Sequence, residues 1–109
     1  TEKITLTKGS ANTGGSDIYD ATAAVGAKTV VVAENLNNND REFFEFGIID
    51  NGTDIFHTEY GNVRTGQQLI VPTFERTSGN LARINFEVGT DLTNGHQIEI
   101  TIVSTVTKK

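Results

Sequence analysis

The residues best suited to chemistry in this sequence are two histidines, His57 and His96. An imidazole can bind a metal or act as a base, but a zinc site needs further ligands at defined spacings. Neither histidine has a second histidine at such a spacing, and the chain contains no cysteine. We therefore expect structural or surface roles for both histidines, and the sequence predicts no metal site.

Nucleophilic catalysis has no recognisable motif here. A catalytic triad brings together a hydroxyl, an imidazole and a carboxylate, but no glycine-flanked nucleophile elbow occurs. The glycine- and serine-rich segment 9–16 lacks the lysine of a phosphate-binding loop. The sequence thus predicts no catalytic residue, no cofactor and no enzyme activity. A small hydrolase is kept as a third hypothesis, which requires His57 or His96 in a pocket beside a carboxylate and a hydroxyl.

One short segment offers several hard oxygen atoms of the kind that Ca²⁺ prefers, on Asp50, Asn51, Thr53 and Asp54. The EF-hand pattern, with a glutamate at its twelfth position, is missing. Asn51 is followed by glycine, and Asn–Gly is a strong signal for a hairpin turn. We therefore interpret the segment as a turn held by its own Asp and Asn side chains.

Length and charge limit the classes of protein that remain. The chain has 109 residues, and we assign residues 1–109 to a single domain with a modest core. Fourteen acidic and nine basic side chains give a net charge of −5. Binding a nucleic-acid backbone calls for clustered lysine and arginine, so nucleic acid is not expected as a partner. No apolar run approaches the roughly 20 residues of a membrane-spanning helix, and no membrane association is expected.

Apolar residues recur at every second position in several segments. The pattern is clearest at Gln97–Val106, and it returns at Arg83–Val88 and Glu42–Ile48. A period of two is typical of an extended strand with one buried face. About eight such short strands, separated by polar turns, predict an all-β chain that folds as an antiparallel β-sandwich or jelly roll.

The N-terminal region is predicted to be the least ordered part. Lys3–Lys8 alternates like a first strand, but Gly9–Ser16 is rich in glycine and serine, as mobile surface loops are. We therefore expect residues 1–16 to form a flexible N-terminal arm with a mobile loop. The alanine-rich segment Thr22–Gly26 is the one place where a helical turn is expected.

A second apolar face is indicated in the middle of the chain. Phe43 points away from Phe44 and Phe46 in an extended strand, and Ile49 shares its side. Such a face is either part of the sandwich core, which we favour, or a contact between subunits.

Four stretches follow one another in an order that resembles small virion structural proteins of tailed bacteriophages, including those of cyanophages. They are Tyr19–Ala21, a strand of Val, Ala and Thr at Gly26–Asn35, a strand that ends in Asp–Asn–Gly at Phe46–Gly52, and the opening of the last strand at Gly95–Ile100.

The resemblance implies a β-sandwich located on the virion. It further implies a capsid decoration (cement) protein, preferred over a neck or tail component, that stabilises the shell by binding neighbouring capsomers. The implied partners are the major capsid protein or other virion components, and further copies of the chain in a homo-oligomer such as a trimer. The candidate contact residues lie in the N-terminal arm, one polar turn and one loop: Lys3, Ile4, Leu6, Asn37, Asn38, Asn39, Tyr60 and Arg64.

A carbohydrate-binding or adhesion module, as part of a tail fibre or a longer protein, is the alternative. Aromatic rings stack on sugar faces, but the chain has no tryptophan, and its two tyrosines, Tyr19 and Tyr60, are isolated in the sequence.

Overall fold

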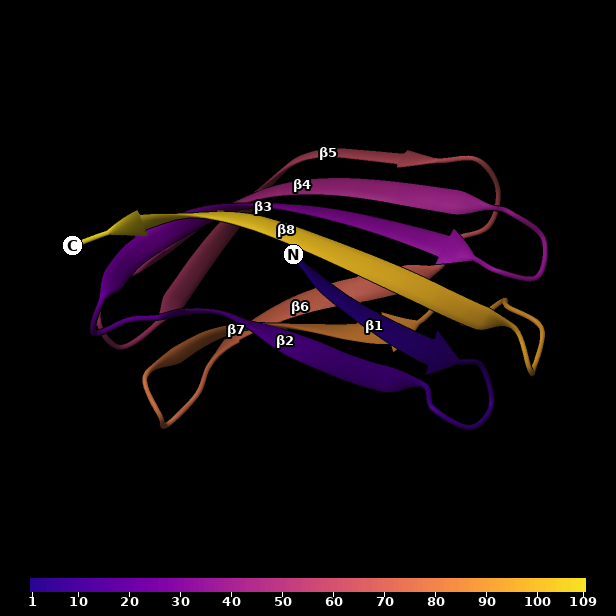
Figure 1. Ribbon diagram of the computed structural model, residues 1–109, viewed down its shortest axis with the longest axis horizontal. Coiled ribbons are helices and arrows are strands. Elements are labelled where there is room, and N and C mark those ends of the chain that lie inside the picture. Colours follow the sequence, from indigo (N-terminus) through magenta and orange to yellow (C-terminus); the bar gives the residue numbers. More distant parts are fainter.

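A computed structural model describes the whole chain, residues 1–109, as eight strands with no helix (Figure 1). No helix is therefore present that could cross a membrane. The strands are β1 (Glu2–Thr7), β2 (Thr13–Asp20), β3 (Ala24–Asn35), β4 (Arg41–Asp50), β5 (Ile55–Arg64), β6 (Ile70–Arg76), β7 (Leu81–Val88) and β8 (Gln97–Lys108).

The strands form two antiparallel sheets that pack face to face. One sheet has five strands in the order β1-β8-β3-β4-β5, and the other has three in the order β2-β7-β6. Figure 1 shows the three-stranded sheet below the five-stranded one, with β5 at the free upper edge. The prediction of an all-β sandwich of about eight strands is confirmed. The unequal strand numbers leave β5 with few contacts to the second sheet.

The core lies between the sheets and is built from the alternating residues that the sequence pattern selects. Phe44, Phe46 and Ile48 of β4 point inward, and so do Ile98 and Ile100 of β8. The rings of Phe44 and Phe46 stack at 5.5 Å between centroids. Because each inward residue is followed by one that faces outward, a single strand supplies both the core and a surface.

The predicted N-terminal arm is wrong, because residues 2–7 are a paired strand of the larger sheet. β1 runs antiparallel to β8 from Glu2 opposite Ile102 to Thr7 opposite Gln97. Leu6 is 3% exposed and belongs to the core. Cross-strand hydrogen bonds and the burial of Leu6 hold the segment in place. Whether the segment is ordered or flexible therefore depends on these contacts and not on its own residue types.

The expected mobile loop at residues 9–16 is also largely a strand. β2 begins at Thr13, which lies opposite Glu87 of β7. A Cβ atom at Gly15 would come within 2.6 Å of the carbonyl oxygen of Ile84. Glycine therefore permits close approach to a neighbouring strand here, a role that the composition of the segment does not distinguish from flexibility.

Two further boundaries differ from the expectation. The alanine-rich segment forms a turn at residues 21–23 and then enters β3 at Ala24, without a helical turn. The residues after Tyr60, expected as a loop, continue β5 as far as Arg64, where Arg64 lies opposite Glu42 of β4. Pairing with β4 extends the strand through Gly61, which by itself is a weak strand former.

The turn between β4 and β5 has the predicted construction. The carboxylate of Asp50 accepts a hydrogen bond from the backbone N–H of Gly52 at 2.8 Å. The side-chain oxygen of Asn51 accepts from the N–H groups of Thr53 and Asp54 at 3.0 and 2.8 Å. Gly52 adopts a φ of 91°, which favours glycine. These hydrogen bonds account for the cluster of oxygen-bearing side chains.

Candidate binding surface

The side of the five-stranded sheet that faces away from the core exposes a set of large apolar side chains. Residues that lie directly opposite each other in paired strands point to the same side of a sheet. Ile49 of β4 lies opposite Phe56 of β5. Phe43 of β4 lies between Val32 of β3 and Val63 of β5, opposite both. We call this surface the outer face and define it by its exposed members: Val25, Val32, Ile49, Phe56, Tyr60, Val63 and Val103.

The outer face corrects the interpretation of Phe43 and Ile49 as sandwich core. Ile49 is 61% exposed, and Phe43 is only half-buried. The three-stranded sheet covers the opposite side of β4, where Phe44 and Phe46 lie. The second apolar face is real but uncovered, and its other interpretation, a contact between subunits, stays a prediction.

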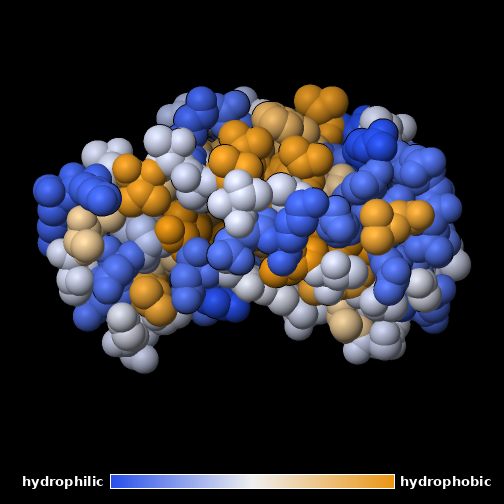
Figure 2. Space-filling model, in the orientation of Figure 1, coloured by the Kyte–Doolittle hydropathy of each residue, from blue (hydrophilic) through white to orange (hydrophobic).

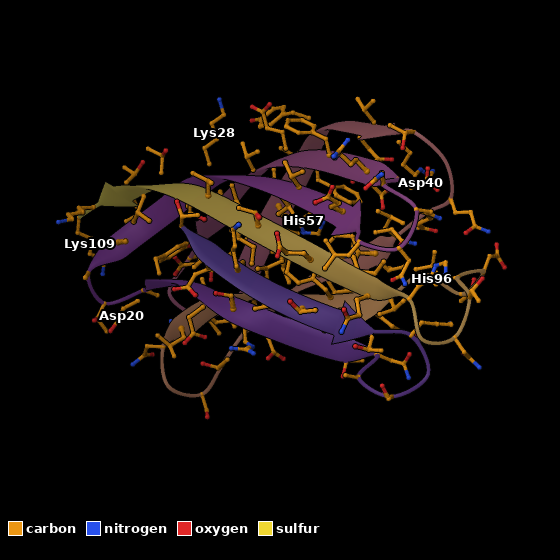
Figure 3. All side chains as sticks on the ribbon, turned by 45° about the vertical axis from the view of Figure 1, so that its right-hand side comes forward. Asp20, Lys28, Asp40, His57, His96 and Lys109 are labelled. Atoms are coloured by element: carbon orange, nitrogen blue, oxygen red, sulfur yellow. The ribbon has the colours of Figure 1, made fainter.

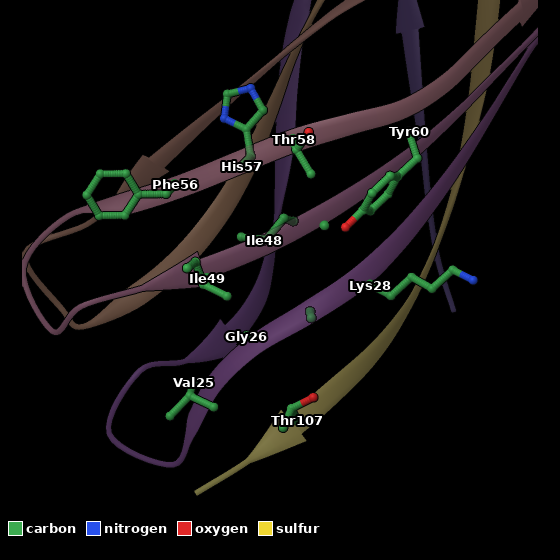
Figure 4. Close-up of a pocket in the computed structure, with 12 residues that line it drawn as sticks. Val25, Gly26, Lys28, Ile48, Ile49, Phe56, His57, Thr58, Tyr60 and Thr107 are labelled. Atoms are coloured by element: carbon green, nitrogen blue, oxygen red, sulfur yellow. The ribbon is translucent and has the colours of Figure 1, made fainter.

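A groove of about 600 Å³ crosses the outer face between β3, β4 and β5. Gly26 and Gly47 are among the residues that line it, and so are Ile49, Phe56 and Tyr60 (Figure 4). A Cβ atom at Gly47 would lie 2.9 Å from the ring of Tyr60. The missing side chain therefore lets this ring lie against β4 while Tyr60 remains 69% exposed.

The charges on the outer face are balanced. Lys28 of β3 lies 3.1 Å from Glu45 of β4. The other two pairs on this face are Arg41 with Glu34 at 2.8 Å and Lys3 with Glu99 at 3.5 Å. Exposed pairs of this kind stabilise a fold weakly. Their consequence here is that the face carries no net charge, while the whole chain carries −5.

The structure does not bring the predicted contact residues together. Lys3, Ile4 and Leu6 lie on β1 at one edge of the large sheet, whereas Tyr60 and Arg64 lie on β5 at the opposite edge. Leu6 is buried, so it is not available to a partner. Ile4 is half-buried against the core, and the ammonium of Lys3 is paired with a glutamate. Tyr60 is the one predicted residue among the exposed apolar members of the outer face, and Lys3 lies on the same face as a charged residue of β1.

The predicted asparagines occupy the turn between β3 and β4. The side-chain oxygen of Asn37 accepts a hydrogen bond from the N–H of Gln97 at 2.9 Å, and that of Asn38 accepts from the N–H of Asp40 at 3.0 Å. Asn39 has a φ of 64°, in the left-handed region that asparagine tolerates. All three residues shape the turn, and their role in binding stays a prediction.

Arg64 contacts a buried carboxylate. Its Nε lies 3.4 Å from Oε2 of Glu42, which is 1% exposed. The other carboxylate oxygen, Oε1, accepts hydrogen bonds from the backbone N–H groups of Leu69 and Ile70 at 2.9 and 3.3 Å. Glu42 therefore fastens the start of β6 to β4. Arg64 completes this arrangement from the solvent side.

The two histidines lie in different parts of the molecule (Figure 3). The ring of His57 on β5 packs against Phe74, with 4.4 Å between centroids. Nδ1 of His96 accepts a hydrogen bond from the side-chain amide of Asn35 at 3.1 Å. No three His, Asp or Glu side chains are grouped so that they could hold a metal ion.

A polar cluster links the two sheets near the β4–β5 turn. The hydroxyl of Tyr19 donates to Asp50 at 2.7 Å, and the guanidinium of Arg76 donates to the carbonyl of Gly52 at 2.9 Å. Burial and the neighbouring carboxylate raise the pKa of Tyr19 above its usual range. Burial also works to raise the pKa of Asp50, but hydrogen bonds from Tyr19 and Gly52 and the charge of Arg76 outweigh it and hold that pKa below its ordinary value. Asp50 is thus kept ionised as a structural bridge.

Most residues of the outer face were not predicted as binding residues, although the strands carry a signal for a second apolar face. Strands β3, β4 and β8 carry apolar residues at neighbouring positions, such as Val31 and Val32, Ile48 and Ile49, and Ile102 and Val103. Neighbouring residues of a strand point to opposite sides, so each pair contributes to both faces of the sheet. The pairs indicate two apolar faces but not which of them is covered.

Comparison with known proteins gives a likeness at the level of the fold. The chain matches no protein-family model, and no curated protein matches its sequence. Among solved structures, it is similar to the crystal structure of the Acinetobacter phage vB_ApiP_P1 tailspike protein, with a TM-score of 0.51 and 15% identity. The match covers 99% of this chain but 20% of the tailspike chain, so this chain spans about a fifth of that protein's length. The sandwich described above is therefore a fold that also occurs within a phage tailspike.

Proposed function

We propose that this chain is a structural component of a phage virion that acts by binding other virion components, and that it belongs to the tail. The observation that carries the proposal is the likeness to a phage tailspike over 99% of the chain. The uncovered outer face adds support, because large exposed apolar surfaces commonly mark binding sites.

The proposal moves the expected location from the capsid shell to the tail. A capsid decoration protein and a tail component both act through adhesive surfaces, so the sandwich fold is compatible with either. The tailspike likeness favours the tail.

Immunogold electron microscopy of purified particles tests the location. Antibodies against the isolated chain are expected to label the tail, and preabsorption with the purified chain should remove the label. Label spread over the head would support the decoration role and refute the tail assignment. Absence of the chain from purified particles, measured by mass spectrometry, would refute any virion role.

A carbohydrate-binding module is the second candidate, and one observation favours it. Phe56 and Tyr60 place exposed aromatic rings beside the groove, with Lys28, Thr58 and Thr107 as polar neighbours. Stacking on such rings would require Tyr60, so a glycan array is to be probed with the native chain and with Tyr60→Ala. Binding by the native chain that the variant loses would favour this candidate, and absence of binding to any glycan would remove it.

A further inference from the structure

We propose that the outer face of the five-stranded sheet binds the same face of a second copy of this chain. The inference goes beyond the proposed virion role and does not depend on it, because it concerns the isolated chain in solution.

The outer face exposes an extensive set of apolar side chains. The seven side chains of the outer face are 37–69% exposed. An aromatic side chain buries about 150–250 Å², and valine and isoleucine bury less, so the exposed parts of the seven come to several hundred Å², on the order of the roughly 300–600 Å² of the largest patch on a typical monomer, which is often functional. A standard interface buries about 800 Å² on each partner. Figure 2 shows several hydrophobic residues close together over the upper middle of the molecule, where Figure 1 places β3, β4 and β5, and others scattered over the rest of this view. The surface is therefore large enough for a protein partner.

Charge identifies this partner as a second copy. A strongly basic protein would be drawn to the surfaces that carry the net charge of −5, and these lie outside the outer face. Two copies of the chain repel each other over those surfaces, but not where charges are balanced. The pairs of Lys28 with Glu45, Arg41 with Glu34 and Lys3 with Glu99 make the outer face neutral. It is the surface on which two acidic copies can approach.

The shape of the face suits a two-fold contact, in which the same patch serves both subunits. It offers a hollow and projections side by side: the groove between β3, β4 and β5, and the exposed side chains of Ile49 and Tyr60 that line it. Each copy can place an apolar side chain in the groove of the other. Tyrosine is enriched among the residues that dominate interface energies, and we assign Tyr60 to that role.

Sedimentation velocity over a series of concentrations from micromolar to millimolar tests the inference. The mass of the native chain is expected to rise with concentration from 11.8 kDa toward that of two copies. Ile49→Lys should raise the dissociation constant at least about tenfold, since it buries an unpaired charge in the contact. Leu36→Lys is the matched control, because Leu36 is an exposed apolar residue in the β3–β4 turn, outside the outer face. It makes the same change of charge and should leave the dissociation constant unchanged.

Several outcomes would overturn the inference. A native chain that stays at 11.8 kDa at every concentration means that the face serves another partner, such as a virion protein or a glycan. Equal effects of Ile49→Lys and Leu36→Lys would mean that overall charge, and not this face, controls association. Circular dichroism checks that the variants fold, and Val63→Lys on β5 replaces Ile49→Lys if it does not. The result is independent of the particle experiment, since a chain absent from virions can still form dimers.

Discussion

The buried carboxylate of Glu42 is predicted to be a principal link between the two sheets. Its Oε1 accepts hydrogen bonds from the backbone N–H groups of Leu69 and Ile70, and its Oε2 accepts one from the side-chain amide of Asn62 at 3.0 Å. The substitution Glu42→Ala removes every one of these contacts. Leu69 and Ile70 are fully buried, so water cannot easily replace the lost acceptor.

The size of the effect follows from these contacts. Each buried donor left without a partner costs about 1–3 kcal/mol, so two orphaned N–H groups should lower the free energy of unfolding by roughly 2–6 kcal/mol in Glu42→Ala. Glu42→Gln keeps one oxygen for Leu69 and Ile70 but loses the charge, and should cost about 1–2 kcal/mol. Arg64→Met breaks an ion pair whose basic partner is 42% exposed, and should cost at most about 1 kcal/mol.

Urea unfolding followed by circular dichroism measures these differences by linear extrapolation. The expected order of destabilisation is Glu42→Ala, then Glu42→Gln, then Arg64→Met. Hydrogen exchange should also show faster exchange at Leu69 and Ile70 in the alanine variant, ahead of the rest of the core. If Glu42→Ala unfolds at the same urea concentration as Arg64→Met, then the carboxylate does not hold β6, and the reasoning is refuted.

Three further predictions address the N-terminal strand, the polar cluster and the β3–β4 turn. Leu6→Ala should lower the free energy of unfolding, measured with urea, by about 2–5 kcal/mol, while Lys3→Ala should change it by no more than about 0.5 kcal/mol. Equally small effects of both substitutions would support the flexible N-terminal arm instead. The folded-state pKa of Asp50 lies below its ordinary value of 3.8, so its contribution to stability is complete above that pH and is lost as pH falls through the lower folded value. The urea midpoint of the native chain should therefore fall more steeply below about pH 4 than that of Asp50→Asn, and equal slopes would contradict this. Asn39→Val should cost about 1–2 kcal/mol, because a branched side chain opposes its left-handed backbone, whereas Asn39→Gly should leave the melting temperature unchanged or higher.

The strands could be predicted from the sequence wherever one face is buried. Ile98, Ile100 and Ile102 alternate with polar residues, and this alternation is typical of a strand with one side in the core. The N-terminal region could not be predicted in the same way. Gly14 and Gly15 are held by pairing with Phe86 and Asn85, some seventy residues away in the sequence. The local sequence around the two glycines does not predict this pairing.

The binding surface was only partly predictable for a related reason. The sequence shows that Phe43 and Ile49 lie on one side of a strand and Phe44 on the other. It does not show that five strands face three, and this unequal layering decides which side is covered. Tyr60, a candidate contact residue, is exposed on this face, whereas Phe56 was not selected, because its exposure results from the position of β5 beyond the smaller sheet.

The irregularity in β5 limits how the larger sheet can grow. β5 has no neighbour on one side, and it contains neither lysine nor proline, the residues that often blunt a free edge. Its pairing with β4 shifts beside Tyr60, so the ladder is interrupted near the middle of the strand. A β-bulge bends the strand and disrupts regular pairing. An added strand could therefore follow only about half of this edge in register, which disfavours fibril-like stacking of one molecule on the next.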